Sequence, residues 1–258
     1  MPRRLVQDYG PSKDAKKGQS EEQARKKAEE LAASGMPFQM AMAVAHGKLT
    51  LSEALERMAR QDKVATLMKR HDLSRALATQ VAMGHADLER VLARQRFEAH
   101  RVEFRNHSIL EVFAESGEPL TVDMHGRRRL TGVVSAMTPY SFNLTVEGGE
   151  PEEIHKLQAM AAWSPDSWKR VRKVLKTDKK RGAEPKDPVP KPQDRYPCSD
   201  KRLFRCLDEE TPVTVTTLEG MQLSGLIRWV SRFELGLTLK GDSEAVIFRH
   251  ALDHLREG

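Results

Sequence analysis

The last sixth of the chain alternates apolar and polar residues in short runs. Val213 and Val215 alternate with threonines, and a second alternating run extends from Phe233 to Leu239. Such a period of two is typical of a strand that buries one face. The pattern predicts five short strands between residues 211 and 255, after a short apolar helix around residues 203–207. One helix followed by five strands with a bent second strand predicts a small, strongly curved barrel.

Glycines and one basic pair divide this region into its predicted strands. Glu219-Gly220 and Lys240-Gly241-Asp242 are turn sequences. Gly225 lies inside the second predicted strand, where a glycine usually marks a bulge or a sharp bend. Arg249-His250 interrupts the apolar run before the last strand.

The same pattern occurs 93 residues earlier. Three matches share this offset: Pro119–Val122 with Pro212–Val215, Leu130–Gly132 with Leu223–Gly225, and Tyr140 with Phe233. Agreement in register over three strands predicts two copies of one β module, at residues 106–163 and 198–258. Placing Ile154-His155-Lys156 opposite Phe248-Arg249-His250 requires an insertion or deletion after the third strand.

The N-terminal part is predicted to be helical. Residues 1–19 are polar and predict a disordered tail. A capping-box pattern at Ser20–Gln23 predicts the start of a charged helix. Within residues 20–105, a second repeat with an offset of 37 joins Val44–Leu55 to Val81–Leu92 and predicts two helical hairpins. In the first hairpin, Thr50 with Glu53 predicts a capping box at the start of the second helix. The fold class is therefore α+β, with helices followed by two β modules.

The hairpin region contains six methionines, which favour a core-filling role over a pliable binding groove. They are Met36, Met40, Met42, Met58, Met68 and Met83. A protein-docking role and a DNA-reading helix-turn-helix both remain open for this region. Neither second helix concentrates base-reading side chains near its start, which disfavours the DNA reading.

Residues 164–197 form a predicted linker, with eleven Lys or Arg against five Asp or Glu before residue 196. Five prolines between residues 185 and 197 favour an extended spacer. A short basic helix is predicted over Trp168–Thr177. Four cations cluster there, at Lys169, Arg170, Arg172 and Lys173. This cluster indicates electrostatic contact with nucleic-acid phosphate.

Composition narrows the class of protein. The net charge is +6 and the pI is near 9.3, which suits an anionic partner. No apolar run reaches the length of a membrane span, and the N-terminus has no apolar signal core, so we expect a cytoplasmic protein without a membrane partner. Cys198 and Cys206 lack the spacing of a zinc site. Phosphate-loop, metalloprotease and serine-hydrolase motifs are absent, so neither a cofactor nor an enzymatic activity is expected.

The C-terminal module resembles the Hfq family of bacterial Sm-like RNA chaperones. The resemblance rests on Thr-Pro-Val-Thr-Val (211–215), Glu-Gly-Met-Gln-Leu-Ser-Gly (219–225), Ser-Arg-Phe (231–233) and Phe-Arg-His-Ala (248–251). It implies that Arg249 and His250 face the pore of a ring and that Phe233, beside Arg232, stacks on a base, most commonly uridine. Tyr140, His155 and Lys156 are the corresponding candidates in the first module. A core role for Phe233 remains the alternative.

Two departures bear on function. The family's arginine-rich rim corresponds here to the acidic Asp208-Glu209-Glu210, and Thr216 replaces an aromatic used for adenine-rich RNA. The resemblance implies a protein that binds single-stranded, U-rich RNA in post-transcriptional regulation. The alternative is a non-catalytic scaffold that uses its β modules to oligomerise and its helical region to dock a protein. Because family members close rings of six modules, three chains are expected to form a pseudo-hexameric ring.

Overall fold

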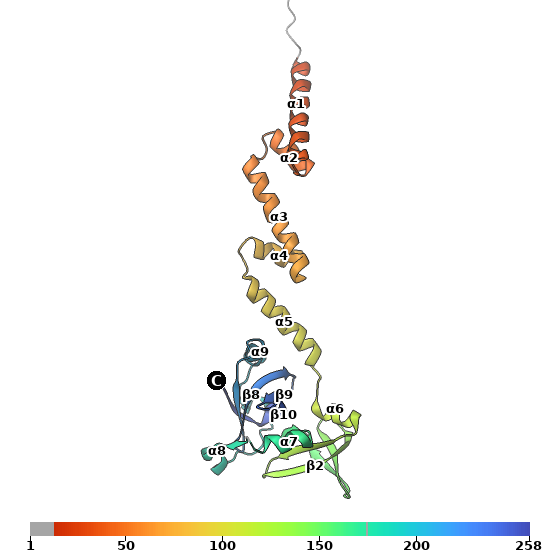
Figure 1. The fold of residues 1–258 in the computed structure, drawn as a ribbon, viewed down its shortest axis with the longest axis vertical. Coiled ribbons are helices and arrows are strands. Elements are labelled where there is room, and N and C mark those ends of the chain that lie inside the picture. The colour runs from red at the N-terminus through yellow and green to blue at the C-terminus, as the bar shows by residue number, and fades with distance from the viewer. Residues whose placement is uncertain (1–12, 174) are drawn as a thin grey trace, which may run out of the picture. The chain divides into compact units, whose positions relative to one another are not determined.

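The computed structural model describes residues 13–173 and 175–258, which form helices followed by an antiparallel sheet (Figure 1). The fold class is therefore α+β. Two compact units divide the chain, residues 1–92 and 93–258. Within the described residues, none of the helices combines the length and apolarity that crossing a membrane requires.

The first unit is helical. Its elements are α1 (Lys13–Ala33), α2 (Phe38–Ala45), α3 (Leu51–His71), α4 (Arg75–Ala82) and the start of α5 (Leu88–Phe104). The offset of 37 relates α2 to α4 at both ends, and it relates the starts of α3 and α5. Thr50 and Glu53 form the predicted capping box of α3. One small core joins α1, α2 and the start of α3, and another joins the end of α3, α4 and the start of α5.

Two details of the helical region differ from expectation. The helix α1 begins at Lys13, so Ser20 lies within it and is not its N-cap. Of the expected tail 1–19, residues 1–12 lie outside the described residues. Met68 and Met83 are exposed, whereas the other four methionines pack in or against the first core. Core filling therefore accounts for four of the six.

The second unit contains a helix and five strands twice. The first repeat has α6 (Ile109–Ser116), β1 (Pro119–Met124), β2 (Arg128–Met137), β3 (Ser141–Val146), β4 (Pro151–His155), the 3-10 helix η1 (Lys156–Gln158) and β5 (Ala159–Trp163). The second repeat has α9 (Asp200–Asp208), β7 (Val213–Thr217), β8 (Met221–Val230), β9 (Glu234–Leu239), β10 (Ser243–Phe248), the 3-10 helix η3 (Arg249–Ala251) and β11 (Leu252–Glu257). The offset of 93 relates β2 to β8, β3 to β9 and η1 to η3 at both ends.

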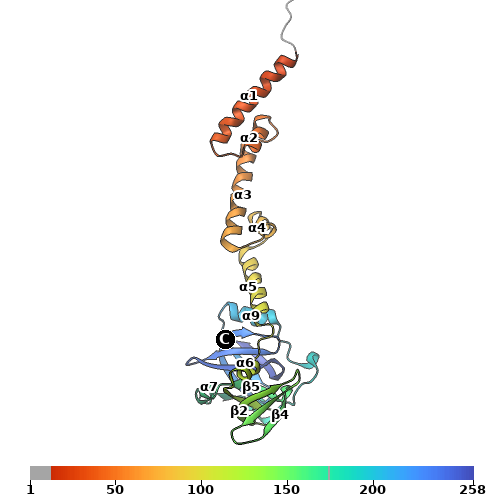
Figure 2. The ribbon, with the colours of Figure 1, turned by 90° about the vertical axis from the view of Figure 1, so that its right-hand side faces the viewer.

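The strands pair in one linear series, β11-β7-β8-β9-β10-β5-β1-β2-β3-β4. Each repeat contributes its strands in the order fifth, first, second, third, fourth. The repeats join where β10 pairs with β5, through Val246 opposite Ala162 and Ile247 opposite Ala161. They lie next to each other, the first in green and the second in cyan to blue (Figure 2). The pairing does not show the two expected bent, five-stranded barrels closed, because β5 pairs with β1 and β10 and not with β4.

The two repeats also share their cores. Ala161 and Trp163 of β5 belong to the apolar cluster of the second repeat, and Phe248 of β10 belongs to that of the first. Removing either repeat would therefore expose apolar side chains of the other.

Gly225 has a different role from the expected bend. The irregularity in β8 lies between Ile227 and Trp229. A Cβ atom on Gly225 would collide with the carbonyl oxygen of Thr238 on β9. Gly225 is therefore required by close approach of two strands.

The predicted linker contains regular structure. Its elements are α7 (Pro165–Val171), β6 (Lys176–Thr177), α8 (Lys179–Ala183) and the 3-10 helix η2 (Pro192–Asp194). The expected helix over Trp168–Thr177 therefore starts and ends earlier. The strand β6 pairs with β8, and Val171 is fully buried in the core of the second repeat. An extended spacer does not describe this segment.

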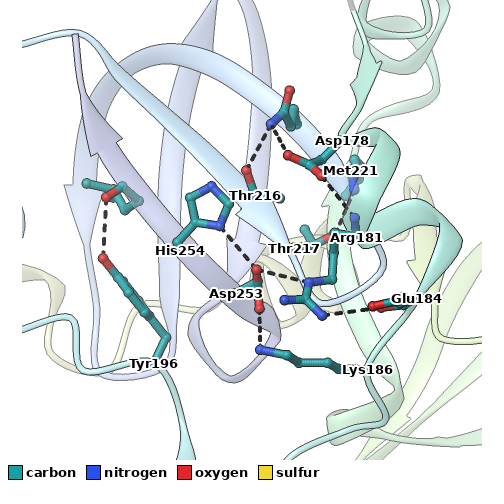
Figure 3. Close-up of polar contacts among 12 residues, drawn as sticks. Asp178, Arg181, Glu184, Lys186, Tyr196, Thr216, Thr217, Met221, Asp253 and His254 are labelled. Atoms are coloured by element: carbon teal, nitrogen blue, oxygen red, sulfur yellow. Dashed lines mark hydrogen bonds and ion pairs between the residues drawn. The ribbon is translucent and has the colours of Figure 1, made fainter.

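Ion pairs fasten the linker to β11. Asp253 accepts from Arg181 Nε at 3.1 Å, from Lys186 Nζ at 2.7 Å and from His254 Nδ1 at 3.1 Å (Figure 3). The Asp253 side chain is 7% exposed. These bonds hold the pKa of its carboxyl below the usual range although burial opposes them. The linker thus docks through a largely buried charge.

Candidate nucleic-acid interface

Phe233 projects from the turn between β8 and β9. Ser231 forms this turn, since its hydroxyl accepts from the backbone N–H groups of Phe233 at 3.4 Å and Glu234 at 3.1 Å. The N–H of Arg249 donates to the carbonyl of Phe233 at 2.8 Å. Phe233 is 59% exposed, so it is not the core residue that the alternative interpretation expected. The Arg232 guanidinium lies 5.0 Å from the ring centroid.

A cavity of about 500 Å³ opens beside this ring, and we call it the Phe233 pocket. Phe233, Arg232, Arg249, His250 and Leu252 line it together with residues from the segment 192–199. The fold therefore brings all four C-terminal candidates to one cavity. An exposed aromatic face next to guanidinium groups suits a stacked base with a nearby phosphate.

Arg249 is held by the wall of the pocket. Its guanidinium donates to the carbonyls of Ser231 at 3.0 Å and Cys198 at 2.9 Å, and it pairs with Asp200 at 2.8 Å. Arg249 thus joins the β8–β9 turn to the chain before α9. In this single chain its charge is largely compensated, so it shapes the pocket.

His250 is 8% exposed and contacts the first repeat. Its Nε2 lies 2.8 Å from the carbonyl oxygen of Ala159 in β5. Because a carbonyl only accepts, Nε2 carries the proton. Burial lowers the pKa of His250 to about 4, so the ring is neutral at neutral pH. His250 therefore fixes the contact between the repeats.

The first repeat holds Tyr140 in the same turn. Thr138 Oγ1 accepts from the N–H groups of Tyr140 at 3.2 Å and Ser141 at 2.9 Å, and the N–H of Lys156 donates to the carbonyl of Tyr140 at 2.8 Å. Tyr140 is 74% exposed. The structure corrects the sequence alignment here, because the equivalent of Arg249 is Lys156, with no insertion or deletion.

The same register pairs His155 with Phe248 and Leu157 with His250. His155 is exposed, and its Nδ1 accepts from the N–H of Leu157 at 3.2 Å, capping η1. The first repeat therefore has an aromatic and a cation in place, without a histidine equivalent to His250.

The three arginines after Gly126 all have protein partners. Arg127 donates to the carbonyl of Gly182 at 2.6 Å, Arg128 makes two bonds to Glu152, and Arg129 makes two bonds to Asp123. These contacts favour a structural role for the three arginines.

The basic cluster of the linker lies on and just after α7. Trp168 anchors this helix, since its ring stacks on Trp163 at 5.2 Å and the Arg129 guanidinium lies 3.5 Å from its centroid. Lys169, Arg170, Arg172 and Lys173 are all exposed. Lys169 pairs with Asp166 at 2.9 Å. The cluster is thus fixed on the sheet and open to solvent.

The Phe233 pocket includes residues that sequence reasoning did not select. Tyr196 comes from the predicted linker, and Cys198 is the first residue of the predicted second module. Their local sequence carries no recognition motif, and only the docking of the linker brings them to the site. Among residues 13–173 and 175–258, no group of three or more His, Cys, Asp or Glu has the arrangement of a metal site.

Comparison with known proteins gives a partial match. No protein-family model matches the chain, and neither does any curated protein. Solved structures that match include the 1.55 Å crystal structure of the pleiotropic translational regulator Hfq. It is 30% identical over 22% of this chain and 92% of that chain, with a TM-score of 0.21. Part of this chain is thus similar to Hfq.

Proposed function

We propose that this protein is a non-catalytic, Sm-like RNA-binding protein that binds single-stranded, U-rich RNA in post-transcriptional regulation. The observation that carries the proposal is the exposed Phe233 ring, with Arg232 beside it, at the mouth of a cavity of about 500 Å³. A solvent-exposed aromatic ring held by a hydrogen-bonded turn needs another explanation than core packing. The sequence resemblance to Hfq supplies the class of ligand.

In this proposal Phe233 stacks on a base, which contributes roughly 1–3 kcal/mol. Arg232 binds the adjacent phosphate. Arg249 and His250 hold the pocket walls in position, because both have hydrogen-bond partners within the protein. The ligand therefore meets a preformed surface, which lowers the ordering cost of binding.

The first repeat and the linker supply further contacts. Tyr140 offers a second stacking ring in the same turn geometry. The backbone N–H of Lys156 donates to its carbonyl, and His155 pairs with the adjacent Ser141. The linker cations Lys169, Arg170, Arg172 and Lys173 attract phosphate without reading sequence. We infer that both repeats are Sm-like and that the second provides base preference.

Binding of oligo-U and oligo-A at two salt concentrations tests the proposal. Wild-type protein is expected to bind oligo-U more tightly, and Phe233→Ala is expected to weaken oligo-U binding without lowering the thermal midpoint. Phe142→Ala, at a buried position, provides the contrasting control that destabilises the fold. Equal affinity of wild type and Phe233→Ala for both oligomers would show that Phe233 does not recognise the base.

Assembly is a second candidate function, favoured by the pairing of β10 with β5. The end strands of the series are β11 and β4. If β4 of one chain paired with β11 of the next in the register of the internal junction, three chains would close a ring of six repeats. Glu153 would then lie opposite Leu255, by the offset of 93. The helical unit would serve to dock a protein partner.

Some features oppose ring closure. The Leu255 carbonyl on β11 accepts from Tyr196 Oη at 3.3 Å and from Arg202 Nη2 at 3.0 Å. On β4, Pro151 and two glutamates are residues that natural proteins use to protect free edges. Native mass spectrometry separates the two states, since a trimer supports the ring and a monomer at micromolar concentration excludes it.

A further inference from the structure

The C-terminal half of α5 packs firmly against α9 and the end of β8. Phe97 contacts Phe204 with ring centroids 5.1 Å apart, and the N–H of Val230 donates to His100 Nε2 at 3.0 Å. Arg96 makes two bonds to Asp208, at 2.6 and 2.8 Å. These contacts fix the side of α5 that carries Arg101 and the following Arg105.

A second cavity, of about 370 Å³, lies at this junction, and we call it the arginine groove. Four arginines line it: Arg101, Arg105, Arg232 and Arg249. The single acidic side chain in the lining, Asp200, pairs with Arg249 at 2.8 Å. His100 is uncharged in this setting, since its Nε2 accepts a hydrogen bond and burial lowers its pKa. The groove therefore has an excess of positive charge.

Two of these arginines have little compensation from acidic groups. The closest ion pair of Arg101 is a 3.8 Å contact to Glu98. Within the described residues, no acidic side chain pairs with Arg105. Both are exposed. Arg101 lies in the last turn of α5, Arg105 directly follows the helix, and both line the groove. Guanidinium groups converging on one cavity fit the oxygen atoms of a phosphate.

The arginine groove adjoins the Phe233 pocket, because Arg232 and Arg249 line both cavities. Arg232 also lies over the Phe233 ring. We propose that the arginine groove binds the phosphodiester backbone of the RNA strand whose base stacks on Phe233. This inference rests on the proposed function and adds α5, which lies outside both β repeats, to the binding surface.

The first repeat lacks counterparts of residues that line this groove. At the offset of 93, Pro139 replaces Arg232 and Glu111 replaces Phe204, and α5 packs on α9 of the second repeat. The strand is therefore expected to leave the second repeat along α5.

The test compares two pairs of substitutions, one within α5 and the other at its C-terminal end. Arg101→Gln with Arg105→Gln removes the charges of the groove. Arg90→Gln with Arg94→Gln removes two exposed charges outside it and serves as the control. Affinities for oligo-U and oligo-A are measured over a range of salt concentrations, with Phe233→Ala in parallel.

We expect the groove variant to lose roughly tenfold in affinity for both oligomers, with a log–log salt slope smaller by about 1.4, since each lost phosphate contact removes about 0.7. Arg101→Lys with Arg105→Lys keeps the charges and is expected to keep the slope. If Phe233→Ala weakens binding while the groove variant matches its control, the groove inference is wrong and the proposed function stands. If wild-type protein binds neither oligomer, both are wrong.

Discussion

The two repeats have the same order of helix and strands. They differ in the side chains at the junction where one repeat meets the other. In both, hydroxyl pairs join the first two strands, Thr121 to Thr131 at 2.9 Å and Thr214 to Ser224 at 2.8 Å. Gly132 lies as close to a neighbouring strand as Gly225 does. The irregularity in the second strand also falls at equivalent positions. These shared features are those that the strand geometry itself requires.

The differences gather where the second repeat docks on the first. Glu234, 3% exposed, accepts from Ser108 Oγ at 2.6 Å and from the N–H of Ile109 at 2.7 Å, so it binds the start of α6. Its counterpart is Ser141. The counterpart of His250 is Leu157. A buried polar group is retained where a partner across the junction satisfies it.

This contrast bears on assembly. A junction between β4 and β11 of different chains would offer Ser141 and Leu157 in place of Glu234 and His250. It would lack the three side-chain hydrogen bonds that Glu234 and His250 make across the internal junction. An intermolecular junction would therefore be weaker than the one within the chain.

The largest expected effect is a loss of stability when the close strand contact that both repeats have is disrupted. Gly225→Ala and Gly132→Ala each place a methyl group against a backbone carbonyl, so each is expected to cost about 3 kcal/mol or more of unfolding free energy. Gly149→Ala is the control, because its new Cβ meets its nearest neighbour at 3.4 Å. Urea unfolding measures the effect. If only one of the two substitutions lowered the free energy of unfolding, the two glycine positions would not be equivalent.

The second prediction concerns pH and the junction. Burial raises the pKa of Glu234 to about 7 from 4.5, so its contribution to stability is lost as pH rises from 4.5 to 7. His250 titrates near 4 instead of 6.5, so its contribution is lost as pH falls through that range. Each pKa shift corresponds to a change of roughly 3 kcal/mol in the free energy of unfolding over its pH range. In the wild-type protein the two changes have opposite signs.

Substituting one of the two residues is expected to reveal the pH dependence of stability that the other contributes. His250→Gln keeps a donor for Ala159 and should leave stability falling as pH rises from 4.5 to 7. Glu234→Gln keeps an acceptor and should leave stability rising with pH between 4 and 6.5. Urea titrations across this range measure both. The same pH profile in both variants would contradict the assigned pKa directions.

The third prediction compares the exposed rings. Phe233→Ala is expected to reduce oligo-U affinity by about 2 kcal/mol, because one stacked base is lost. Tyr140→Ala should have a smaller effect, since its repeat lacks counterparts of Arg232 and His250. Fluorescence titration with oligo-U measures both. A larger loss with Tyr140→Ala would assign the main site to the first repeat.

The smallest expected effect is that of single linker cations. Replacing Arg170 with Gln should lower the salt slope by about 0.7 and the affinity only a few-fold, as expected for one phosphate contact. Lys169→Gln should have less effect, because Lys169 already pairs with Asp166. Titrations at several salt concentrations provide the slopes. Unchanged slopes after replacing Lys169, Arg170, Arg172 and Lys173 together would leave this segment a purely structural role.

The sequence determined the local elements. Alternation of apolar and polar residues predicted most strands. The offset of 93 related the two repeats without any knowledge of their contacts. The capping box at Thr50 and Glu53 located the start of α3. Signals of this kind depend on residues a few positions apart, so they can be read from the chain alone.

The tertiary structure decided which side chains reach across the molecule. The resemblance implied that Arg249 and His250 face a pore. Within the chain, Arg249 donates to the carbonyl of Cys198 before α9, and His250 forms a hydrogen bond with Ala159 of β5. No periodic pattern in the sequence predicted that the linker docks on Asp253 or that α5 packs on α9. Their partners lie far apart in sequence, and the free energy of such contacts comes from burial that only the assembled sheet provides.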